Sequence, residues 1–417
     1  MHNQFDVVVV GAGVAGLAAA RKLRELGRTV RVVEASHRVG GRAFTDRRTF
    51  SIPFDLGCAW LHQADRNPLT PIARRLRLHL LDHEQATQHF RDNGVLLTAR
   101  EASAVAAAHR MLEKKMEEHH PCDRSLASLL DDASDWAQQI ALRWIAELDA
   151  GGDAADMSVH GIVEQGSEFP NWLVEEGMGR IVESLAEGLD VSLNQPVTRI
   201  EHLPQGVKIG TPGGDLRASH CVVTVSTGVL RAEAIRFVPA LGNPMLTALE
   251  MLPMGHFNKV VLEFDGRLPG FAPGDWLTEG RTFQPERALA FVVNPFGSNL
   301  VAGLAGGAYG RKLSTMALRD ATGEVLARLK DCLGSLHGLR VVASLNTDWS
   351  ANPLFHGSYA YLRTGGGEAR KTLANAGTER IHFAGEATAD ALAQTCGGAF
   401  LTGVRVAGKL DRLLGAQ

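Results

Sequence analysis

Three glycines near the beginning of the sequence have the spacing of a phosphate-binding turn. Gly11, Gly13 and Gly16 form G-x-G-x-x-G between an apolar run over 5–10 and a helical pattern that Gly27 ends. The first glycine of this motif allows a tight turn, the second lets a pyrophosphate approach the backbone, and the third lets helix and strand pack closely. The helix N-terminus then offers unpaired N–H groups to the phosphates. In this context the motif predicts a dinucleotide-binding site.

Charged residues that follow support the same chemistry. A second predicted strand, TVRVVE, ends in Glu34, 18 residues after Gly16, where a carboxylate can accept hydrogen bonds from both hydroxyls of an adenosine ribose. The negative charge argues against NADP, because it would repel the phosphate on that ribose. Gly40 and Gly41 then form a second loop that a ligand can approach closely, and Arg42 can bind a diphosphate with two hydrogen bonds.

A lysine in another strand-like run is the third candidate. In FNKVVLEF, residues 257–264, a side-chain period of two places Lys259 on one face with Val261 and Glu263. Taken locally, Lys259 is interpreted as a solvated cation at the start of a strand, because lysine is seldom buried without a partner. A chemical role for this residue therefore depends on what the rest of the chain places around it.

The composition indicates a protein of two structural units that acts on small molecules. At 417 residues the chain is too long for one ordinary core. Its formal charge of −3 lacks the positive field that nucleic-acid binding usually needs, so we expect no nucleic-acid partner. The longest apolar run, VVVVGAGVAGLAAA, has 14 residues and three glycines and follows no basic region, so we expect neither a membrane span nor export. The expected location is the cytoplasm.

Neither the cysteines nor the histidines predict a metal site. The five cysteines are scattered and odd in number, and no two form a C-x-x-C pair, which indicates a reducing compartment and no structural zinc. They are Cys58, Cys122, Cys221, Cys332 and Cys396. Five histidines of a mainly helical block are interpreted as surface or core residues, because no acid or cysteine cluster accompanies them. They are His79, His83, His89, His119 and His120.

The elements that must position these residues alternate between two kinds of pattern. The first strand, turn, helix and strand are followed by an extended segment over 53–61 and then by a helical block over about 66–148. Residues 174–226 again indicate α/β structure, so the nucleotide-binding unit is interrupted and resumed. The elements predicted beyond this are strands with irregular connections over 236–310, a helix over 318–334, a strand over 340–349, a strand over 380–384 and a helix from about 397 to 414.

As an ordered set, these motifs resemble the FAD-dependent amine oxidases. This family includes monoamine oxidases, polyamine and spermine oxidases, and lysine-specific histone demethylases. The resemblance covers most of the chain, is strongest over 5–72, 174–264 and 346–410, and is weak through the helical block. The motifs that carry it are VVGAGVAGL, GGR, DLGCAWLHQADRNPL, EGMGRIV, VVTVSTGVL, NKVVLEF, DWSANPLFHGSYAY and FAGEAT.

The resemblance implies a fold of the α/β and α+β classes. A Rossmann-like FAD-binding domain, discontinuous in sequence, is expected to carry an inserted substrate-binding domain made of the helical block and a mixed sheet. The FAD-binding domain is expected to consist of 1–62, 174–240 and 350–417. The substrate-binding domain is expected to consist of 63–173 and 241–349.

The resemblance also implies a set of residues that bind FAD. Glu34 is expected at the adenosine ribose, Arg42 on the diphosphate side, Val197 at the adenine through its backbone, and Glu386 at the ribityl chain. Ser358 stands where covalent monoamine oxidases have the cysteine that bonds the flavin, so we expect FAD to be held non-covalently. The full set expected at the cofactor is Gly11, Gly13, Gly16, Glu34, Ala35, Gly41, Arg42, Val197, Gly385, Glu386 and Thr395.

Other matched residues are expected near the reacting atoms. Lys259 matches the family lysine that bridges through a water to the reactive flavin nitrogen, where a cation favours electron transfer to dioxygen and where burial could lower its pKa. His62 matches a histidine that could contact an amine or relay a proton, and a purely structural role for it stays open. Thr395 stands where monoamine oxidases have the second tyrosine of an aromatic cage, which disfavours a cage of that type. The expected substrate pocket is Trp60, His62, Trp349, Tyr359 and Thr395, with core packing as the alternative role for the aromatic residues Trp349 and Tyr359.

The reaction that the resemblance implies is oxidation of an amine. A hydride passes from the carbon next to nitrogen to FAD, the imine hydrolyses, and dioxygen reoxidises the flavin to give hydrogen peroxide. The expected partners are dioxygen and a small-molecule amine, possible substrates being a polyamine or another primary or secondary amine. An L-amino-acid oxidase or a desaturase of the same fold is the alternative, and a flavin-bound protein without turnover is the alternative of another class. The sequence leaves the oligomeric state undetermined.

Acidic residues between 147 and 176 concern the charge of the substrate. They could form an acidic rim that attracts a cationic amine, or an ordinary solvated surface. They are Glu147, Asp149, Asp153, Asp156, Glu164, Glu168, Glu175 and Glu176.

Overall fold

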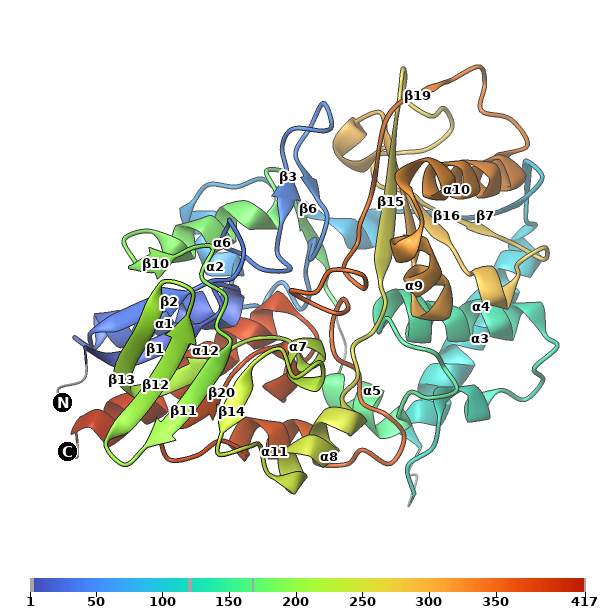
Figure 1. Ribbon diagram of the computed structural model, residues 1–417. Coiled ribbons are helices and arrows are strands. Elements are labelled where there is room, and N and C mark those ends of the chain that lie inside the picture. Colours follow the sequence, from blue (N-terminus) through green and yellow to red (C-terminus); the bar gives the residue numbers. More distant parts are fainter. Residues whose placement is uncertain (1–3, 119–121, 167–168, 416–417) are drawn as a thin grey trace.

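The larger of two main sheets is assembled from separated parts of the chain. In the computed structural model, which describes residues 4–118, 122–166 and 169–415, eight strands join in the order β10-β2-β1-β13-β12-β11-β14, with β20 beside β13. This sheet forms the left-hand lobe of Figure 1. Its strands are β1 (Phe5–Val10), β2 (Val30–Val33), β10 (Val191–Ser192), β11 (Arg199–Leu203), β12 (Gly206–Thr211), β13 (Gly214–Val223), β14 (Arg236–Val238) and β20 (Ile381–Phe383).

Helices cover both faces of this sheet, which explains the continuous apolar run at its centre. Val7 and Val9 of β1 pack toward α1, α6 and α12, whereas Val8 and Val10 pack toward α8 and α11. A strand that is buried on both faces needs apolar residues at every position rather than at alternate ones. The helices of this lobe are α1 (Val14–Glu25), α2 (Thr70–Arg75), α6 (Met178–Ala186), α7 (Thr227–Arg231), α8 (Asn243–Met251), α11 (Ala369–Asn375) and α12 (Cys396–Gly415).

The parallel strands of this sheet end together. In register, Val10 of β1 lies beside Val33 of β2 and Val223 of β13. The loops that follow these strands therefore meet at one edge of the sheet, which is where doubly wound folds bind their ligands. The predicted strand over 5–10, the helix after it and the Rossmann-like arrangement are confirmed.

A second, seven-stranded sheet forms the core of the other lobe. Its order is β19-β15-β18-β17-β16-β7-β8, and α9 and α10 pack on one of its faces (Figure 1). Its strands are β7 (Gln88–Asp92), β8 (Val95–Leu96), β15 (Asn258–Phe264), β16 (Trp276–Glu279), β17 (Ala290–Val293), β18 (Leu300–Ala305) and β19 (Val341–Asn346). Its helices are α9 (Gly307–Thr315) and α10 (Leu318–Leu333).

Helices of the inserted segment build a wall beside this sheet. The wall consists of α3 (Ala99–Glu117), α4 (Trp136–Arg143), a π-helical turn (Trp144–Asp149) and α5 (Val159–Gln165). Two small sheets complete the fold: β3 (Thr45–Asp46) pairs with β4 (Phe54–Asp55), and β9 (Trp172–Val174) lies between β5 (Trp60–Leu61) and β6 (Leu80–Asp82).

Two stretches differ from the sequence-based prediction. The block over 66–148 was expected to be helical, but β6, β7 and β8 lie within it. Short apolar runs such as LRLHLL fit a strand or a helix, and here pairing of β6 with β9 and of β7 with β16 decides for strands. Residues 236–310 were expected to hold strands and loops, but α8 begins there with a proline in its first turn, which favours helix initiation.

Parts of the sequence-based interpretation fall outside the described structure or remain predictions. His119, His120 and Glu168 lie outside the described residues. The division into domain segments stays a prediction, although the larger sheet draws on residues 5–33, 191–238 and 381–383 and the second on 88–96, 258–305 and 341–346. Within the described ranges, no helix combines the length and apolar character needed to cross a membrane.

Candidate active site

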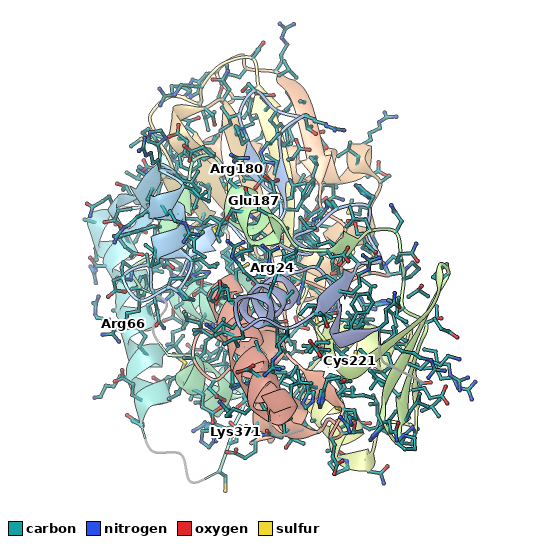
Figure 2. All side chains as sticks on the ribbon, turned by 90° about the vertical axis from the view of Figure 1, so that its left-hand side faces the viewer. Arg24, Arg66, Arg180, Glu187, Cys221 and Lys371 are labelled. Atoms are coloured by element: carbon teal, nitrogen blue, oxygen red, sulfur yellow. The ribbon has the colours of Figure 1, made fainter. Side chains whose placement is uncertain are left out.

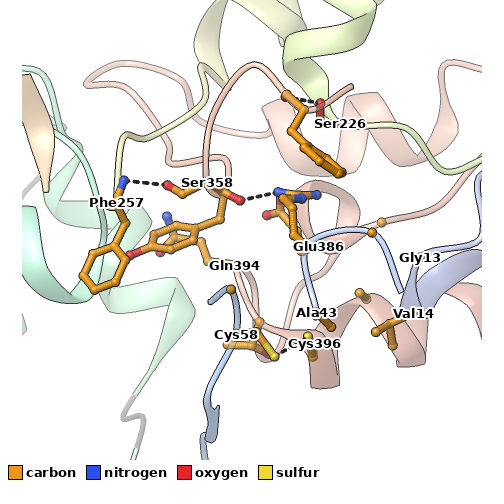
Figure 3. Close-up of a pocket in the computed structure, with 18 of the residues that line it drawn as sticks. Gly13, Val14, Ala43, Cys58, Ser226, Phe257, Ser358, Glu386, Gln394 and Cys396 are labelled. Atoms are coloured by element: carbon orange, nitrogen blue, oxygen red, sulfur yellow. Dashed lines mark hydrogen bonds and ion pairs between the residues drawn. The ribbon is translucent and has the colours of Figure 1, made fainter. Parts of the chain in front are cut away.

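A cavity of about 920 Å³ lies between the edge of the larger sheet, the second sheet and the helical wall. Figure 3 shows part of its lining, with residues from the glycine loop, the segment over 56–60, and the beginning of α12. With two exceptions, Gly16 and Lys259, every residue that the sequence placed at the cofactor or substrate lines this cavity. The structure therefore brings together positions that are nearly 400 residues apart in sequence.

The glycine loop presents bare backbone to the cavity. Gly11 has a φ of +103°, which favours glycine, and a Cβ on Gly16 would lie 2.0 Å from the carbonyl oxygen of Gly11. A Cβ on Gly13 would meet no atom within 4 Å, so this face is open to a ligand. Gly13 is also the N-cap of α1 and supplies no side chain to its first N–H groups. The loop thus fits a pyrophosphate at a helix N-terminus.

Glu34 is held by the loop that it faces. Its Oε2 accepts a hydrogen bond from the N–H of Ala12 at 2.6 Å, and its Oε1 accepts one from the N–H of Ser36 at 2.8 Å. Each carboxylate oxygen keeps a further acceptor site, so the side chain can still bind ribose hydroxyls. Ala35 and Val197 line the same end of the cavity, where the sequence predicts the adenosine.

Arg42 and Glu386 form one ion-paired unit. The Arg42 guanidinium donates to Oε1 of Glu386 at 3.0 Å and to the carbonyl oxygen of Ser358 at 2.6 Å. Glu386 is 5% exposed and also accepts from the N–H of Ala360. Ser358 itself uses its hydroxyl to accept from the N–H of Phe257 at 2.9 Å. These bonds fix the orientation of Arg42 at the cavity wall.

Thr395 caps the N-terminus of α12, which lies at the cavity. Its hydroxyl accepts from the N–H of Gly398 at 3.1 Å and donates to the carbonyl oxygen of Leu392 at 2.7 Å. Because α12 begins directly after Thr395, the positive end of its dipole faces the cavity. Gly385, with a φ of +150° and open space where its Cβ would be, forms the wall nearby.

Lys259 is buried behind the segment over 55–57, so its interpretation as a solvated cation is wrong. The side chain is 2% exposed, and its Nζ donates to the carbonyl oxygens of Asp55 and Gly57, each at 2.7 Å. Nζ also lies 5.5 Å from the ring centre of Trp60. Burial lowers the pKa of Lys259 to about 8, whereas the Asp55 carboxylate opposes this shift. A cavity of about 30 Å³ beside it is large enough for one water molecule.

A cluster of aromatic rings, of which the sequence predicted only Trp60, lines the end of the cavity where the substrate is expected, called here the substrate end. Trp60 and Trp276 stack with ring centres 6.0 Å apart, and Trp144 meets Trp276 edge-on at 5.2 Å. The indole N–H of Trp60 donates to Nδ1 of His83, whose Nε2 donates to the carbonyl oxygen of Gly274. This pairing fixes the neutral tautomer, and burial lowers the pKa of His83. Because these rings come from four separate segments, the spacing of aromatic residues in the sequence could not predict the cluster.

The other predicted aromatic residues, Trp349 and Tyr359, also line the cavity. Trp349 is 7% exposed and donates its indole N–H to the carbonyl oxygen of Leu56 at 3.2 Å. Tyr359 donates its hydroxyl to the carbonyl oxygen of Asp149 at 3.2 Å. Both rings line the cavity and also pack against neighbouring residues. The pocket role and the core-packing role that the sequence left as alternatives are therefore compatible.

The histidines divide between the cavity and the rest of the protein. Nδ1 of His62 lies 2.6 Å from the amide oxygen of Asn171, and both residues line the cavity. His83 also lines it, whereas His79 lies at the surface beside Glu176 and His89 pairs with Asp275. Among the described residues, no group of three or more His, Cys, Asp or Glu side chains could hold a metal ion.

Acidic residues line the substrate end, but only one belongs to the group expected from sequence. Of the acids between 147 and 176, Asp149 lines the cavity, Glu147 is buried against Arg143, and Asp156 pairs with Arg363. The remaining acids at this end are Glu84, Glu113 and Glu117. Glu113 and Glu117 lie one turn apart on α3, a spacing that puts both on one face of a helix. The four-residue spacing of Glu113 and Glu117 was the sequence signal for a shared acidic face, and the sequence-based prediction did not include these two residues.

The described residues fit a bound dinucleotide. Bare glycine backbone, a helix N-terminus without a side-chain cap, and a carboxylate at the end of β2 occur in one cavity of sufficient size. The family model described as flavin containing amine oxidoreductase matches residues 14–114 and 106–410. The chain belongs to the flavin-containing amine oxidoreductase family. Membership confirms the prediction of an FAD-dependent amine oxidoreductase.

Individual members of the family resemble this chain over nearly all of its length. Polyamine oxidase 4 of Oryza sativa subsp. japonica is 28% identical over 96% of this chain and 88% of its own length. Lysine-specific histone demethylase 1 homolog 3 of Arabidopsis thaliana is 29% identical over 99% of this chain, which spans 30% of that protein. The matched demethylases thus extend well beyond the region that corresponds to this chain.

Solved structures support the fold class. Wild-type putrescine oxidase bound to putrescine superposes with a TM-score of 0.79 at 22% identity, over 97% of this chain and 98% of the other. A double mutant of putrescine oxidase, made in a redesign of its cofactor binding, gives a TM-score of 0.80 at 21% identity, over 98% and 99%. The likeness confirms the predicted fold, while the roles of individual residues stay predictions.

Proposed function

We propose that this protein is an oxidase of aliphatic amines that carry a second positive charge, such as diamines and polyamines. The observation that carries the proposal is the charge distribution of the cavity. Four acidic residues line its substrate end, whereas Arg42, at the cofactor end, is the one arginine or lysine among the described lining residues. The names of the related polyamine oxidase and of the structurally similar putrescine oxidase support the same substrate class.

The cofactor end would hold FAD through the residues described above. Glu34 would bind the ribose of the adenosine, the backbone of the glycine loop the diphosphate, and Glu386 the ribityl chain, with Arg42 oriented by its ion pair. When bound there, FAD supplies the acceptor for a hydride from the carbon next to the amine nitrogen, and dioxygen is the final acceptor, giving hydrogen peroxide.

The substrate end would bind the two amino groups of the substrate in different protonation states. The amine that reacts must be neutral, because its lone pair supports the developing positive charge on carbon, and apolar rings such as Trp60 and Trp276 disfavour the ammonium form. The second amine stays protonated, and the acids on α3 and at Asp149 attract it. Lys259, behind the segment over 55–57, would supply a cation close to the site of dioxygen reduction.

The same charge distribution weighs against an amino-acid substrate. An L-amino acid needs a cationic partner for its carboxylate, and the guanidinium of Arg42 is already bonded to Glu386 and to the carbonyl oxygen of Ser358. An acidic rim would also repel that carboxylate. The amine substrate is therefore favoured over the amino-acid alternative.

Anaerobic mixing of the purified yellow protein with candidate substrates tests the proposal. We expect putrescine or spermidine to bleach the flavin absorbance faster than a monoamine of equal chain length, and amino acids to leave it unchanged. Admission of dioxygen should then restore the colour and release hydrogen peroxide. Bleaching by amino acids alone would overturn the substrate class. Absence of bleaching and of peroxide with every donor would favour the flavin-bound protein without turnover.

We further propose that FAD is held without a covalent bond. Ser358 stands where covalent relatives have a cysteine, and a serine hydroxyl is a much weaker nucleophile than a thiolate. Two cysteines, Cys58 and Cys396, do line the cavity, so the proposal needs a direct test. Acid precipitation of the protein should leave the yellow flavin in the supernatant. Yellow colour that stays with the pellet after digestion and peptide separation would show a covalent bond instead.

A further inference from the structure

Two thiols that are far apart in sequence meet at the wall of the cavity. Sγ of Cys58 and Sγ of Cys396 lie 2.7 Å apart, and both residues line the cavity (Figure 3). Neither thiol has a place in the oxidation of an amine. We propose that Cys58 and Cys396 form a dithiol site that hydrogen peroxide oxidises to a disulfide.

The backbone on both sides is held in place. The N–H of Cys58 donates to the carbonyl oxygen of Arg42 at 3.2 Å, and a Cβ on the preceding Gly57 would lie 1.6 Å from that same oxygen. Cys396 is the first residue of α12, fixed by the Thr395 cap and by Gly398, whose Cβ would lie 2.1 Å from the carbonyl oxygen of Leu392. The sulfur atoms need to approach by only about 0.7 Å to reach the ~2.05 Å of a disulfide bond.

The chemistry balances with hydrogen peroxide as the oxidant. One thiolate attacks a peroxide oxygen, the O–O bond breaks, and a sulfenic acid forms with release of water. The second thiol then attacks the sulfenic sulfur, the S–S bond forms, and a second water leaves, so that two thiols and one peroxide give one disulfide and two waters. Both cysteines are partly exposed at the cavity, so a small oxidant can reach them. The site itself stands on its geometry, and only the origin of the peroxide within this cavity rests on the proposed function.

The rate of this reaction should depend on pH. The hydrogen bond between the two sulfur atoms and the burial of the thiol raise the pKa of Cys58, and the Asp55 carboxylate acts in the same direction, although Lys259 opposes this shift. Little thiolate is therefore present at neutral pH, and oxidation should become faster as the pH rises. The remaining cysteines supply references within the same chain, since Cys221 and Cys332 are buried and Cys122 is exposed.

Peptide mapping of the flavin-bound protein tests the site. A Cys122→Ser background removes the exposed thiol and prevents links between molecules. After treatment with added hydrogen peroxide at mildly alkaline pH, the protein is denatured, alkylated without reductant, digested and analysed by mass spectrometry. We expect a peptide pair that joins residues 58 and 396 and is two hydrogens lighter than its separate parts. Alkylatable thiols should fall from four to two, and dithiothreitol should restore them.

Matched variants make the test decisive. Cys396→Ala in the same background should give no linked peptide, and Cys221 and Cys332 should remain alkylated throughout. The proposal is overturned if Cys58 and Cys396 both remain alkylatable, or if either is oxidised singly to sulfinic acid while no linked peptide forms. Because the peroxide is added, a linked peptide in a protein that oxidises no amine would support this site and count against the proposed function alone.

Discussion

At the scale of single residues, the proposed chemistry depends on a lysine that the structure buries. Lys259 donates to two carbonyl oxygens and lies near the face of Trp60, so its ammonium group is stabilised although its side chain is 2% exposed. Asp55, whose pKa burial raises to about 6, accepts hydrogen bonds from the N–H of Met178. The position of the lysine thus depends on a polar network that reaches from β4 to the start of α6.

Replacement of this lysine should affect flavin reoxidation more than flavin binding. In Lys259→Met, the rate at which dioxygen reoxidises the reduced flavin is expected to fall about 10- to 100-fold, because a cation near the developing charge is lost. FAD content and the midpoint of thermal unfolding serve as controls, and both should change little by comparison. In the unaltered protein the same rate should fall as the pH rises through about 8, where Lys259 loses its proton, and the variant should lack this dependence. Stopped-flow absorbance across this pH range checks both statements, and equal reoxidation rates would remove Lys259 from the mechanism.

At the scale of elements, two helices that both begin at the cavity, α1 and α12, come into backbone contact at one glycine. A Cβ on Gly403 of α12 would lie 2.2 Å from the carbonyl oxygen of Ala15 in α1, and the two helices lie side by side near the centre of Figure 2. Gly408, on the same helix, has open space, since its Cβ would approach nothing closer than Arg412 at 3.9 Å.

These two glycines give a matched pair of substitutions. Gly403→Ala is expected to lower the free energy of unfolding by about 1–3 kcal/mol, because the new methyl group forces the helices apart. Gly408→Ala is expected to raise it by about 0.5–1 kcal/mol, because alanine favours a helix and restricts the unfolded chain. Denaturant unfolding of both variants measures the difference. Equal effects would mean that the close contact of α1 and α12 does not limit stability.

Two neighbouring strands of the larger sheet carry a buried pair of histidines. Nε2 of His382 in β20 lies 3.3 Å from Nδ1 of His220 in β13. Burial, with help from Arg380, lowers the pKa of His220 to about 4, and burial with Lys409 and His220 lowers that of His382 to about 3. Below the ordinary pKa of 6.5, the unfolded chain therefore takes up protons that the folded protein cannot.

This pair should make the protein sensitive to acid. The two neutral histidines cost no stability above pH 6.5, and the free energy of unfolding falls as the pH drops from 6.5 toward 4. For each histidine, the folding equilibrium constant should fall by up to about tenfold per pH unit in this range. Asp55, with its raised pKa, acts in the opposite direction, so comparison with a variant is needed. In His220→Leu/His382→Leu, the free energy of unfolding should fall less steeply between these pH values. An unchanged slope would assign the acid sensitivity to other groups.

At the scale of the whole molecule, a protein with a net charge of −3 places Glu84, Glu113, Glu117 and Asp149 in the lining of one cavity. In Glu113→Gln/Glu117→Gln, the KM for putrescine should rise about three- to tenfold, and added salt should reduce the difference, because both acids are exposed and their field is screened. A monoamine should be affected less. Glu187→Gln is the control, since Glu187 is exposed but does not line the cavity (Figure 2). Steady-state kinetics at low and high salt make the comparison, and equal effects of Glu187→Gln would refute the acidic rim.

The sequence by itself predicted a dinucleotide cofactor and the elements expected to hold it, and the family resemblance specified FAD. The glycine spacing, Glu34 and the run over 5–10 are local patterns, because a turn, a helix N-terminus and a buried strand each depend on neighbouring residues. The resemblance carried by longer motifs supplied Arg42 and Glu386, but their ion pair joins segments 344 residues apart and became visible only in the folded chain.

Only the tertiary structure decided which groups gather at the end of the cavity where the amine is proposed to react. The cluster around Trp276, the acids on α3 and the burial of Lys259 result from packing between the second sheet, the helical wall and the larger sheet. The contact between Cys58 and Cys396 spans 338 residues, so the spacing of the cysteines gave no sign of it. Local sequence specifies backbone conformation and solvent preference, whereas contacts between distant side chains depend on how complete elements pack.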